Sequence, residues 1–156
     1  MGQRLLFLGV DGGGTRCRAR LVDPGGAILG ESVAGPANIR IGLEESVRSV
    51  MAATGHCLAQ AGASFSDRSD TIVACLALAG ASEPREAATA QAAFEVRFRR
   101  VVVATDAHAA CVGAHRGEDG GVIIVGTGSI GWAVRGRGSV RGGGWGFPVS
   151  GGGSGA

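Results

Sequence analysis

A glycine-rich turn near the N-terminus is the first feature of this sequence that could carry out chemistry. Residues Gly9 to Thr15 read Gly-Val-Asp-Gly-Gly-Gly-Thr and follow an apolar run that is typical of a buried strand. Three successive glycines allow backbone N–H groups to converge on one point, and the Thr15 hydroxyl adds a donor, so the turn suits phosphate oxygens. Asp11, at the end of the strand, could hold Mg²⁺ through water. A plain hairpin turn explains the same glycines equally well, so this motif alone does not separate the two interpretations.

A second glycine–threonine turn, Gly126-Thr-Gly, lies nearer the C-terminus. With Gly131 it spells GxGxxG after an apolar strand, which is the pattern of a dinucleotide-binding site. That site requires a following helix and an acidic residue about 20 positions further on. Here the next residues, from Trp132, are typical of a strand, and no Asp or Glu follows Asp119. A Walker A loop is excluded too, because it requires a lysine and this chain has none. The turn is therefore a second candidate phosphate loop.

Asp106 lies between the two turns, after a predicted buried strand and before a predicted helix. Aspartate is among the best residues for a helix N-cap, which would explain it without any function. A carboxylate at the C-terminal end of a strand also faces the crevice where α/β sheets bind ligands. It could act as a general base toward a hydroxyl that attacks a γ-phosphate. Both roles are compatible in one residue.

The expected elements alternate in a way that places these residues at strand ends. Apolar runs and period-two alternation predict strands at 5–10, 15–22, 27–34, 71–78 and 101–104. Three- and four-residue spacing predicts a helix from Leu43 to about Ala61, whose apolar stripe comprises Leu43, Val47, Val50, Met51, Thr54, Leu58 and Ala61. A short Ala-rich helix is expected from Glu83 to Phe94, and another short helix from Thr105 to about Ala114. This βββαβαβα order predicts an α/β fold with a mixed sheet and helices on its faces.

From Gly120 the three-strand pattern begins again, with strands expected at 122–125, at 129–135 and from Val140. We expect an N-terminal lobe over residues 1–116 and the first strands of an incomplete second lobe over residues 117–156. The second lobe is expected to be truncated, because no helix follows that could cover its sheet, and an uncovered apolar face is a liability.

The composition excludes several classes of protein. A chain of 156 residues that is 45% hydrophobic is ordered rather than disordered. A net charge of +2, with every basic residue an arginine, gives little support for binding nucleic acid. No apolar run is long enough to span a membrane, and the N-terminus does not resemble a signal peptide. We therefore expect a cytoplasmic protein with neither nucleic acid nor membrane as a partner.

The spacing of the cysteines, histidines and arginines indicates structural positions rather than a metal site. The four cysteines, Cys17, Cys57, Cys75 and Cys111, form no CxxC pair and are expected to be buried reduced thiols. His108 and His115 are two helical turns apart, too far for joint metal ligation, which favours surface or interface positions. Arg16, Arg18 and Arg20 alternate along a predicted strand and are expected to share one solvated face.

Two glycine–threonine turns with an aspartate between them resemble the actin-like ATPase (ribonuclease H-like) fold that sugar kinases share. The closer resemblance is to the BadF/BadG/BcrA/BcrD ATPase family, and within it to bacterial glucosamine and N-acetylglucosamine kinases. The segments that carry the resemblance are Gly9 to Thr15, Pro36 to Ile39, Leu76 to Ala81, Thr105 to Ala107, Gly126 to Ser129 and Gly143 to Gly146. Their order and spacing span almost the whole chain.

The resemblance implies ATP- and Mg²⁺-dependent phosphorylation of a small-molecule amino sugar, glucosamine or N-acetylglucosamine, at its 6-hydroxyl. By the same resemblance Asp106 would be the catalytic base and Asp11 the Mg²⁺ partner. Phosphate contacts would come from Gly12, Gly13, Gly14, Thr15, Gly126, Thr127, Gly128 and Ser129, and sugar contacts from Asn38, Gly80, Asp106, Gly144 and Trp145. A homodimer is left open.

The sequence departs from the family pattern in two ways. Family members usually read Asp followed by Glu or Gln where this chain has Gly151-Gly152, and they are about twice as long. The absent part would carry the adenine pocket and a helix that returns to complete the first lobe. Two alternatives follow. One is an ATPase that activates a 2-hydroxyacyl-CoA dehydratase or benzoyl-CoA reductase, and the other is a truncated, non-catalytic fragment that binds a sugar or a partner.

Overall fold

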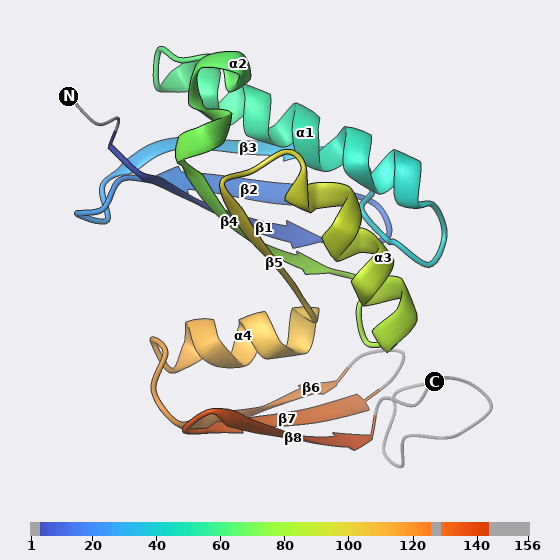
Figure 1. The fold of residues 1–156 in the computed structure, drawn as a ribbon. Helices are drawn as coiled ribbons and strands as arrows, with labels where there is room; N and C mark the ends of the chain where they lie inside the picture. Colours follow the sequence, from blue (N-terminus) through green and yellow to red (C-terminus); the bar gives the residue numbers. More distant parts are fainter. Residues whose placement is uncertain (1–3, 126–128, 144–156) are drawn as a thin grey trace. The chain divides into compact units, whose positions relative to one another are not determined.

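The computed structural model describes residues 4–125 and 129–143, and the chain divides into two compact units, Met1–Asp106 and Ala107–Ala156 (Figure 1). The first unit contains a five-stranded sheet in the order β3-β2-β1-β4-β5. Its strands are β1 Leu6–Gly12, β2 Cys17–Val22, β3 Ile28–Ala34, β4 Ile72–Leu78 and β5 Arg100–Ala104. The first three strands pair antiparallel, whereas β1, β4 and β5 run parallel. The predicted meander and mixed sheet are confirmed.

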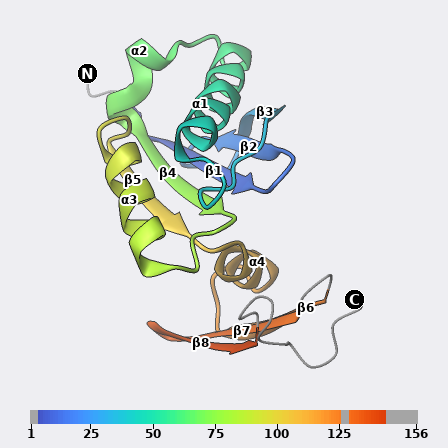
Figure 2. The same ribbon diagram turned by 90° about the vertical axis from the view of Figure 1, so that its right-hand side faces the viewer.

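Two long helices cover one face of this sheet (Figure 2). Helix α1, Leu43–Gln60, lies along β1, β2 and β3, and helix α3, Pro84–Glu95, lies beside β5. Both contribute to the same buried cluster, so both pack on the same face rather than on opposite faces. The other face of the sheet carries partly exposed apolar side chains, including Phe7 and Val102.

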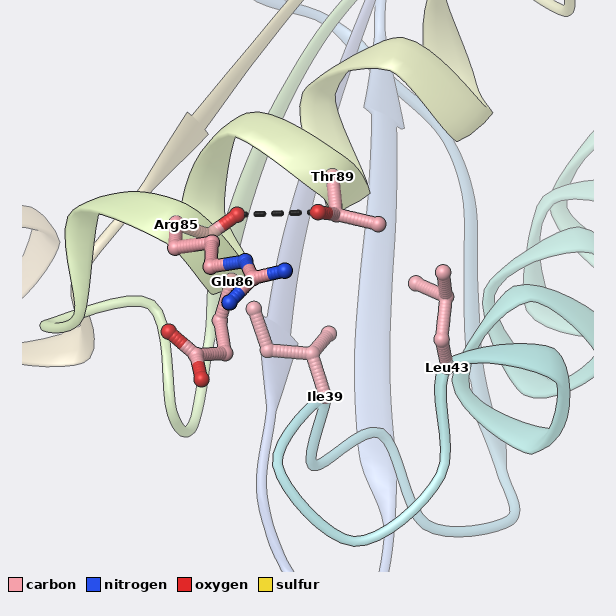
Figure 3. Close-up of a pocket in the computed structure, with 5 residues that line it drawn as sticks. All are labelled: Ile39, Leu43, Arg85, Glu86 and Thr89. Atoms are coloured by element: carbon pink, nitrogen blue, oxygen red, sulfur yellow. Dashed lines mark hydrogen bonds between the residues drawn. The ribbon is translucent and has the colours of Figure 1, made fainter.

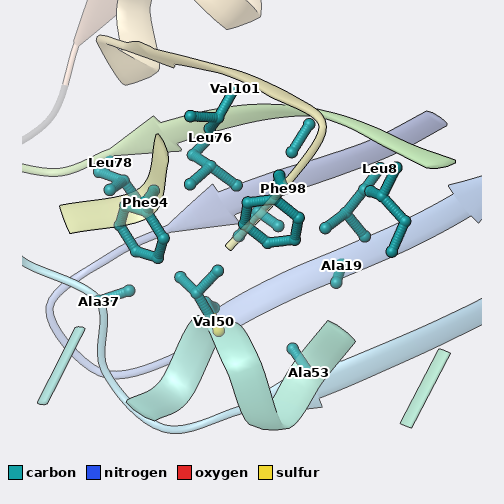
Figure 4. Close-up of a cluster of buried hydrophobic side chains, with 14 of the residues drawn as sticks. Leu8, Ala19, Ala37, Val50, Ala53, Leu76, Leu78, Phe94, Phe98 and Val101 are labelled. Atoms are coloured by element: carbon teal, nitrogen blue, oxygen red, sulfur yellow. The ribbon is translucent and has the colours of Figure 1, made fainter. Parts of the chain in front are cut away.

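The hydrophobic core lies between the sheet and these two helices (Figure 4). Alternate strand residues such as Leu8 and Leu76 point into it and meet Val50 of α1 and Phe94 of α3, all at most 2% exposed. Burying side chains of this size stabilises a fold by about 1.5–3 kcal/mol each. Phe98 closes the core by stacking on Phe94, with ring centroids 6.4 Å apart. This layer fixes the strands whose ends carry the candidate site.

The buried side of α1 differs from the predicted apolar stripe, because small residues replace part of it. Val50, Thr54 and Leu58 are buried as expected, but Ala61 follows the helix and is exposed. Small side chains complete the buried side: Ser46, Ser49, Ala53 and Cys57. Small residues are needed there because α1 approaches β3 closely. A Cβ at Gly30 would lie 2.8 Å from the Cα of Cys57.

A short helical segment between α1 and β4 is absent from the sequence-based prediction. It comprises α2, Phe65–Arg68, and the 3₁₀ helix η1, Ser69–Thr71. One turn is too short for hydrophobic periodicity to reveal. Phe65 secures it by packing edge-to-face against Phe98, with ring centroids 5.7 Å apart.

Three of the four cysteines are buried free thiols, as predicted, but Cys75 is exposed. Cys75 points to the sheet face that α1 and α3 leave uncovered, where Phe7, Val73 and Val102 surround it in a shallow groove. These neighbours withdraw the thiol partly from water, and this desolvation raises its pKa.

We expect Cys75 to be the one thiol that iodoacetamide alkylates in the folded protein. Because its pKa is raised, less thiolate is present at neutral pH than for a free cysteine, so alkylation should be slower and should accelerate as pH rises. Mass spectrometry of the digested protein would measure the modification. Modification of Cys17 or Cys57 at the same rate without denaturant would contradict the described core.

The second unit is a three-stranded antiparallel sheet with a helix packed against it. Strands β6 Gly120–Val125, β7 Ser129–Arg135 and β8 Gly138–Gly143 pair in chain order, and helix α4 spans Asp106–Ala114. The Cys111 thiol donates to the carbonyl of Gly120 at 3.2 Å. His115 lies 3.1 Å from the carbonyl of Gly121, and the His108 ring packs edge-to-face on Trp132.

These contacts group α4 with the second sheet, so the compact units divide ten residues before the predicted lobe boundary at residue 116. The lobe assignment itself stays a prediction. Both histidines are half-buried and serve to pack α4 on the sheet. No helix in the described part of the chain is long and apolar enough to cross a membrane.

Candidate functional site

Three parallel strands end at the same edge of the first sheet and bring the two candidate aspartates to it. Asp11 of β1 lies opposite Ala77 of β4, and Ala77 lies opposite Ala104 of β5. Neighbouring strands are about 4.8 Å apart, so the Asp11 and Ala104 backbones are separated by roughly 10 Å. Asp106 follows two residues beyond Ala104. The sheet register therefore places Asp11 and Asp106 at one edge, as the sequence predicts for strand-end residues.

Backbone hydrogen bonds join the loops at this edge into one surface. The carbonyl of Gly12 accepts from the N–H of Ala79, and the carbonyl of Gly13 accepts from the N–H of Ala37, each at 2.8 Å. The N–H of Ile39 donates to the carbonyl of Ala79 at 3.0 Å. The loops after β1, β3 and β4 are thus held against one another. Each of these three loops carries residues predicted to bind a ligand.

Asn38 and Gly80 are in contact in the loops after β3 and β4. The side-chain oxygen of Asn38 accepts from the N–H of Arg40 at 3.1 Å. This bond orients the amide so that its N–H₂ group is available to a ligand. Gly80 has φ +91°, and a Cβ there would lie 2.6 Å from Cγ of Arg40 and 3.2 Å from the Asn38 oxygen. Gly80 therefore permits the arrangement of Asn38 and Arg40.

The glycines of the turn after β1 differ in whether the protein structure itself requires a residue without a Cβ. A Cβ at Gly12 would lie 2.7 Å from Cδ2 of Leu78, so packing requires glycine at this position. Gly13 and Gly14 are not among the glycines with positive φ, and a Cβ at Gly14 would meet nothing within 4 Å. The hairpin itself therefore gives no reason for glycine at position 14.

Two backbone donors in this turn have no acceptor among the described residues. The N–H of Gly13 donates to the carbonyl of Arg16 at 2.9 Å. Within the described residues, the N–H groups of Gly14 and Thr15 donate to no protein acceptor, and both residues are exposed. Two adjacent donors on an exposed turn can bind an anionic oxygen.

The two carboxylates at this edge are both open to solvent. Asp11 is exposed on the strand just before the turn, and no described residue forms an ion pair with it. Asp106 is also exposed, and it is the first residue of α4. An exposed carboxylate with no ion pair, such as Asp11, provides the oxygen ligand that Mg²⁺ prefers.

Part of the predicted site lies outside the described residues: Gly126, Thr127, Gly128, Gly144 and Trp145. Ser129 is the first residue of β7 and lies opposite Val125, the last residue of β6. The segment after the second glycine turn is thus a strand that returns antiparallel. This agrees with the exclusion of a dinucleotide-binding site, which needs a helix there.

A hollow of about 200 Å³ borders the Asn38 loop on its helix side (Figure 3). Its lining residues are Ile39, Leu43, Arg85, Glu86 and Thr89, from the loop before α1, the first residue of α1 and the first turns of α3. Thr89 donates to the backbone carbonyl of Arg85 at 2.9 Å, which holds that turn. Sequence reasoning did not single out Arg85 and Glu86, because two charges at a helix start look like ordinary solvated residues.

Comparisons with known proteins agree with this geometry. The model of the BadF/BadG/BcrA/BcrD ATPase family matches residues 8–156. The chain is 44% identical over 150 residues to the glucosamine kinase GspK of Vibrio cholerae, covering 96% of this chain and 50% of that protein. It is 31% identical over 157 residues to an N-acetylmuramic acid/N-acetylglucosamine kinase of Clostridium acetobutylicum, covering 95% and 49%. The chain spans about half the length of the curated relatives it matches.

A solved structure from Chromobacterium violaceum, described as a candidate N-acetylglucosamine kinase, has the same fold. It superposes with a TM-score of 0.80 at 32% identity, over 93% of this chain and 50% of that one. This likeness confirms the predicted α/β fold of the actin-like, sugar-kinase type. Because the family model accounts for nearly every residue from β1 onward, the chain belongs to the BadF/BadG/BcrA/BcrD ATPase family.

Proposed function

We propose that this chain carries the phosphate-binding and catalytic edge of an ATP-dependent kinase that phosphorylates an amino sugar, glucosamine or N-acetylglucosamine, at its 6-hydroxyl. The family and the names of the relatives support a sugar kinase. The loops after β1, β3 and β4 support it independently, because together with Asp11 of β1 they present backbone N–H groups suited to phosphate, a carboxylate and an amide along one edge.

The observation that carries the proposal is the open space at Gly14. A hairpin turn would require glycine for positive φ or for packing, and Gly14 has neither reason. Close approach of a ligand to the backbone is the remaining reason for a residue without a Cβ. The N–H groups of Gly14 and Thr15, which donate to no described acceptor, suit an anionic ligand, and a nucleotide phosphate fits.

In the proposed reaction Asp106 accepts the proton of the sugar 6-hydroxyl as that oxygen attacks the γ-phosphorus of ATP. The bond from the γ-phosphorus to the β,γ-bridging oxygen breaks, and ADP leaves. Asn38 and Gly80 line the sugar side of the edge, and the N–H groups of Gly14 and Thr15 stabilise the phosphate charge. Asp11 would hold Mg²⁺, which neutralises charge on the phosphates when bound. The Mg²⁺ requirement, the cytoplasmic location and the roles of the second turn remain predictions.

A coupled assay of ADP release tests this proposal. The purified protein is incubated with MgATP and glucosamine, with N-acetylglucosamine, or with no sugar. ADP release that depends on one of the amino sugars supports the kinase, and NMR of the product would show whether oxygen 6 carries the phosphate. Turnover that is independent of sugar would favour the activating ATPase instead. Binding of sugar without turnover would favour the non-catalytic fragment.

Replacing Gly14 by alanine should weaken nucleotide binding without affecting folding. The added methyl group meets no protein atom within 4 Å, so the melting temperature should change little. It would occupy the space where a phosphate approaches, and we expect about a tenfold loss of ATP affinity by titration calorimetry, the cost of one weakened charge-assisted hydrogen bond. Unchanged affinity would show that the phosphate binds elsewhere.

A further inference from the structure

Each of the two outermost strands of the first sheet is hydrogen-bonded to a glutamine side chain from a helix. These strands are β3 and β5, and the glutamines belong to α1 and to α3, which lies beside β5 (Figure 2). On β3, the amide of Gln60 accepts from the N–H of Glu31 at 3.1 Å and donates to the carbonyl of the same residue at 2.7 Å. On β5, the amide of Gln91 accepts from the N–H of Val103 at 2.8 Å and donates to the carbonyl of Val101 at 2.9 Å.

Each glutamine bonds its strand as a further strand would. A side-chain amide has the donor and the acceptor of a peptide group. In an antiparallel ladder a residue exchanges both bonds with one partner residue, which is the pattern of Gln60 on β3. In a parallel ladder the bonds are slanted and reach residues on either side of the partner, which is the pattern of Gln91 on β5. Gln91 therefore holds β5 on its outer side, as β4 does on its inner side.

The bonds of Gln91 lie at the end of β5 that leads to the candidate base. Val103 is the last residue but one of β5, three residues before Asp106. Gln91 is itself held in place, because its Nε2 also donates to the carboxylate of Glu95 at 2.9 Å, one turn further along α3. Phe94 anchors this turn of α3 in the hydrophobic core, where it is fully buried. A chain of contacts thus runs from the core through Gln91 to the backbone just before Asp106.

The other glutamine bonds a part of the sheet that is remote from both candidate aspartates. Glu31 lies in the middle of β3, and β3 and β5 are at opposite ends of the strand order β3-β2-β1-β4-β5. The loop that follows β3 is held by backbone bonds of its own, from Ala37 to Gly13 and from Ile39 to Ala79. Gln60 and Gln91 therefore make the same kind of bonds, but only those of Gln91 adjoin the segment that carries Asp106.

We propose that Gln91 is a positioning residue for Asp106, holding the end of β5 so that the Asp106 carboxylate reaches the hydroxyl from which it takes a proton. This inference rests on the proposed function and assigns it a residue that acts through the strand, without contact to the substrate. Catalytic groups work only within about 0.5 Å of the productive geometry, and a displacement of about 1 Å can cost a factor of 10² in rate. A strand end that loses two hydrogen bonds on its outer side can move by such a distance.

Gln60 provides a matched control for this role. The variants Gln91→Met and Gln60→Met keep the length of the side chain and a good helix former, and each loses two bonds to a strand. We expect Gln91→Met to lower kcat of sugar-dependent ADP release by about tenfold to a hundredfold. Its affinity for MgATP, measured by titration calorimetry, should not change, because the glycine turn follows β1 and β4 separates β1 from β5. Gln60→Met should lower the melting temperature by a similar amount and keep the wild-type kcat.

Amide hydrogen exchange, followed by NMR, tests the bond itself without reference to activity. In Gln91→Met the N–H of Val103 should exchange about tenfold faster than in the wild-type protein, the effect of one lost hydrogen bond. In Gln60→Met its exchange should be unchanged. An unchanged exchange rate in Gln91→Met would overturn the inference, because the bond would not hold the strand.

The kinetic outcomes separate this inference from the proposed function. If Gln91→Met keeps the wild-type kcat although the N–H of Val103 exchanges faster, the positioning role is overturned and the function stands. Equal losses of kcat in Gln91→Met and Gln60→Met would overturn it too, because they would reflect a general loss of stability. If the wild-type protein releases no ADP in response to an amino sugar, the proposed function fails, and the role of Gln91 fails with it.

Discussion

Replacing Asp106 by asparagine is expected to abolish the sugar-dependent release of ADP. Loss of a general base typically lowers kcat by about 10²- to 10⁴-fold. Asparagine has nearly the same shape as aspartate, so α4 should still begin at this position. The measurement is the coupled assay with saturating MgATP and amino sugar, together with a thermal melt of the variant.

The control for Asp106 is a second Asp→Asn change, at an exposed carboxylate to which no catalytic role is assigned. Asp119 is an exposed aspartate in the second unit, where its carboxylate accepts from the N–H of Gly136 at 2.7 Å. Asp119→Asn should retain activity. If Asp106→Asn keeps more than about a tenth of wild-type kcat, it lies outside the range expected for a lost base, and Asp106 serves only as the first residue of α4.

Replacing Gly30 by alanine is expected to have the largest effect on stability. The new Cβ would lie 2.8 Å from the Cα and 2.9 Å from the carbonyl carbon of Cys57, and these backbone atoms of α1 cannot rotate away. Helix α1 would have to shift from β3, which also disturbs Gln60, whose amide bonds both the N–H and the carbonyl of Glu31. Overpacking of this kind costs about 1–3 kcal/mol or more. At the upper end of that range, Tm should fall by about 6–12 °C.

Gly55, in the same helix, is the matched control for Gly30. A Cβ at Gly55 would meet nothing within 4 Å, and its φ is not positive. Gly55→Ala should therefore stabilise the protein by about 0.5–1 kcal/mol, because alanine is the better helix former. Denaturant unfolding measures both variants. If Gly30→Ala is as stable as the wild-type protein, the close approach of α1 to β3 is wrong.

Periodicity in the sequence was sufficient to predict the order of the main elements. A short stretch of sequence is enough to predict a strand with alternating burial, such as β2, or an apolar strand such as β4. The reason is that every second residue of a strand points to the same face. Observed strand limits fall within one or two residues of the predicted ones, for example Leu6–Gly12 against 5–10. The one-turn helix at Phe65–Arg68 was missed because only its contact with Phe98 identifies it.

Motifs identified the family and the candidate residues, but they did not show how these residues meet. The family resemblance rested on short segments in a fixed order, and the match over residues 8–156 confirms it. The backbone bonds that hold the loops of Gly13, Asn38 and Gly80 together join strands far apart in the chain. Such contacts depend on the strand order β3-β2-β1-β4-β5, which no local pattern specifies.

By itself, then, the sequence determined the class of fold, the family and the set of phosphate-binding candidates, because these depend on local patterns and on residue identity. Only the tertiary structure showed that residues of the same type, close together in the sequence, have different surroundings. Arg18 and Arg20 look alike along the strand, but the cross-strand register differs. Arg20 lies opposite Glu31 and pairs with it, whereas Arg18 lies opposite Asp11 and forms no ion pair with it. Gly12 and Gly14 are likewise neighbours in a triple glycine, but packing against Leu78 explains only the first. Register and packing are properties of residues brought together by the fold, and for that reason they cannot be read along the chain.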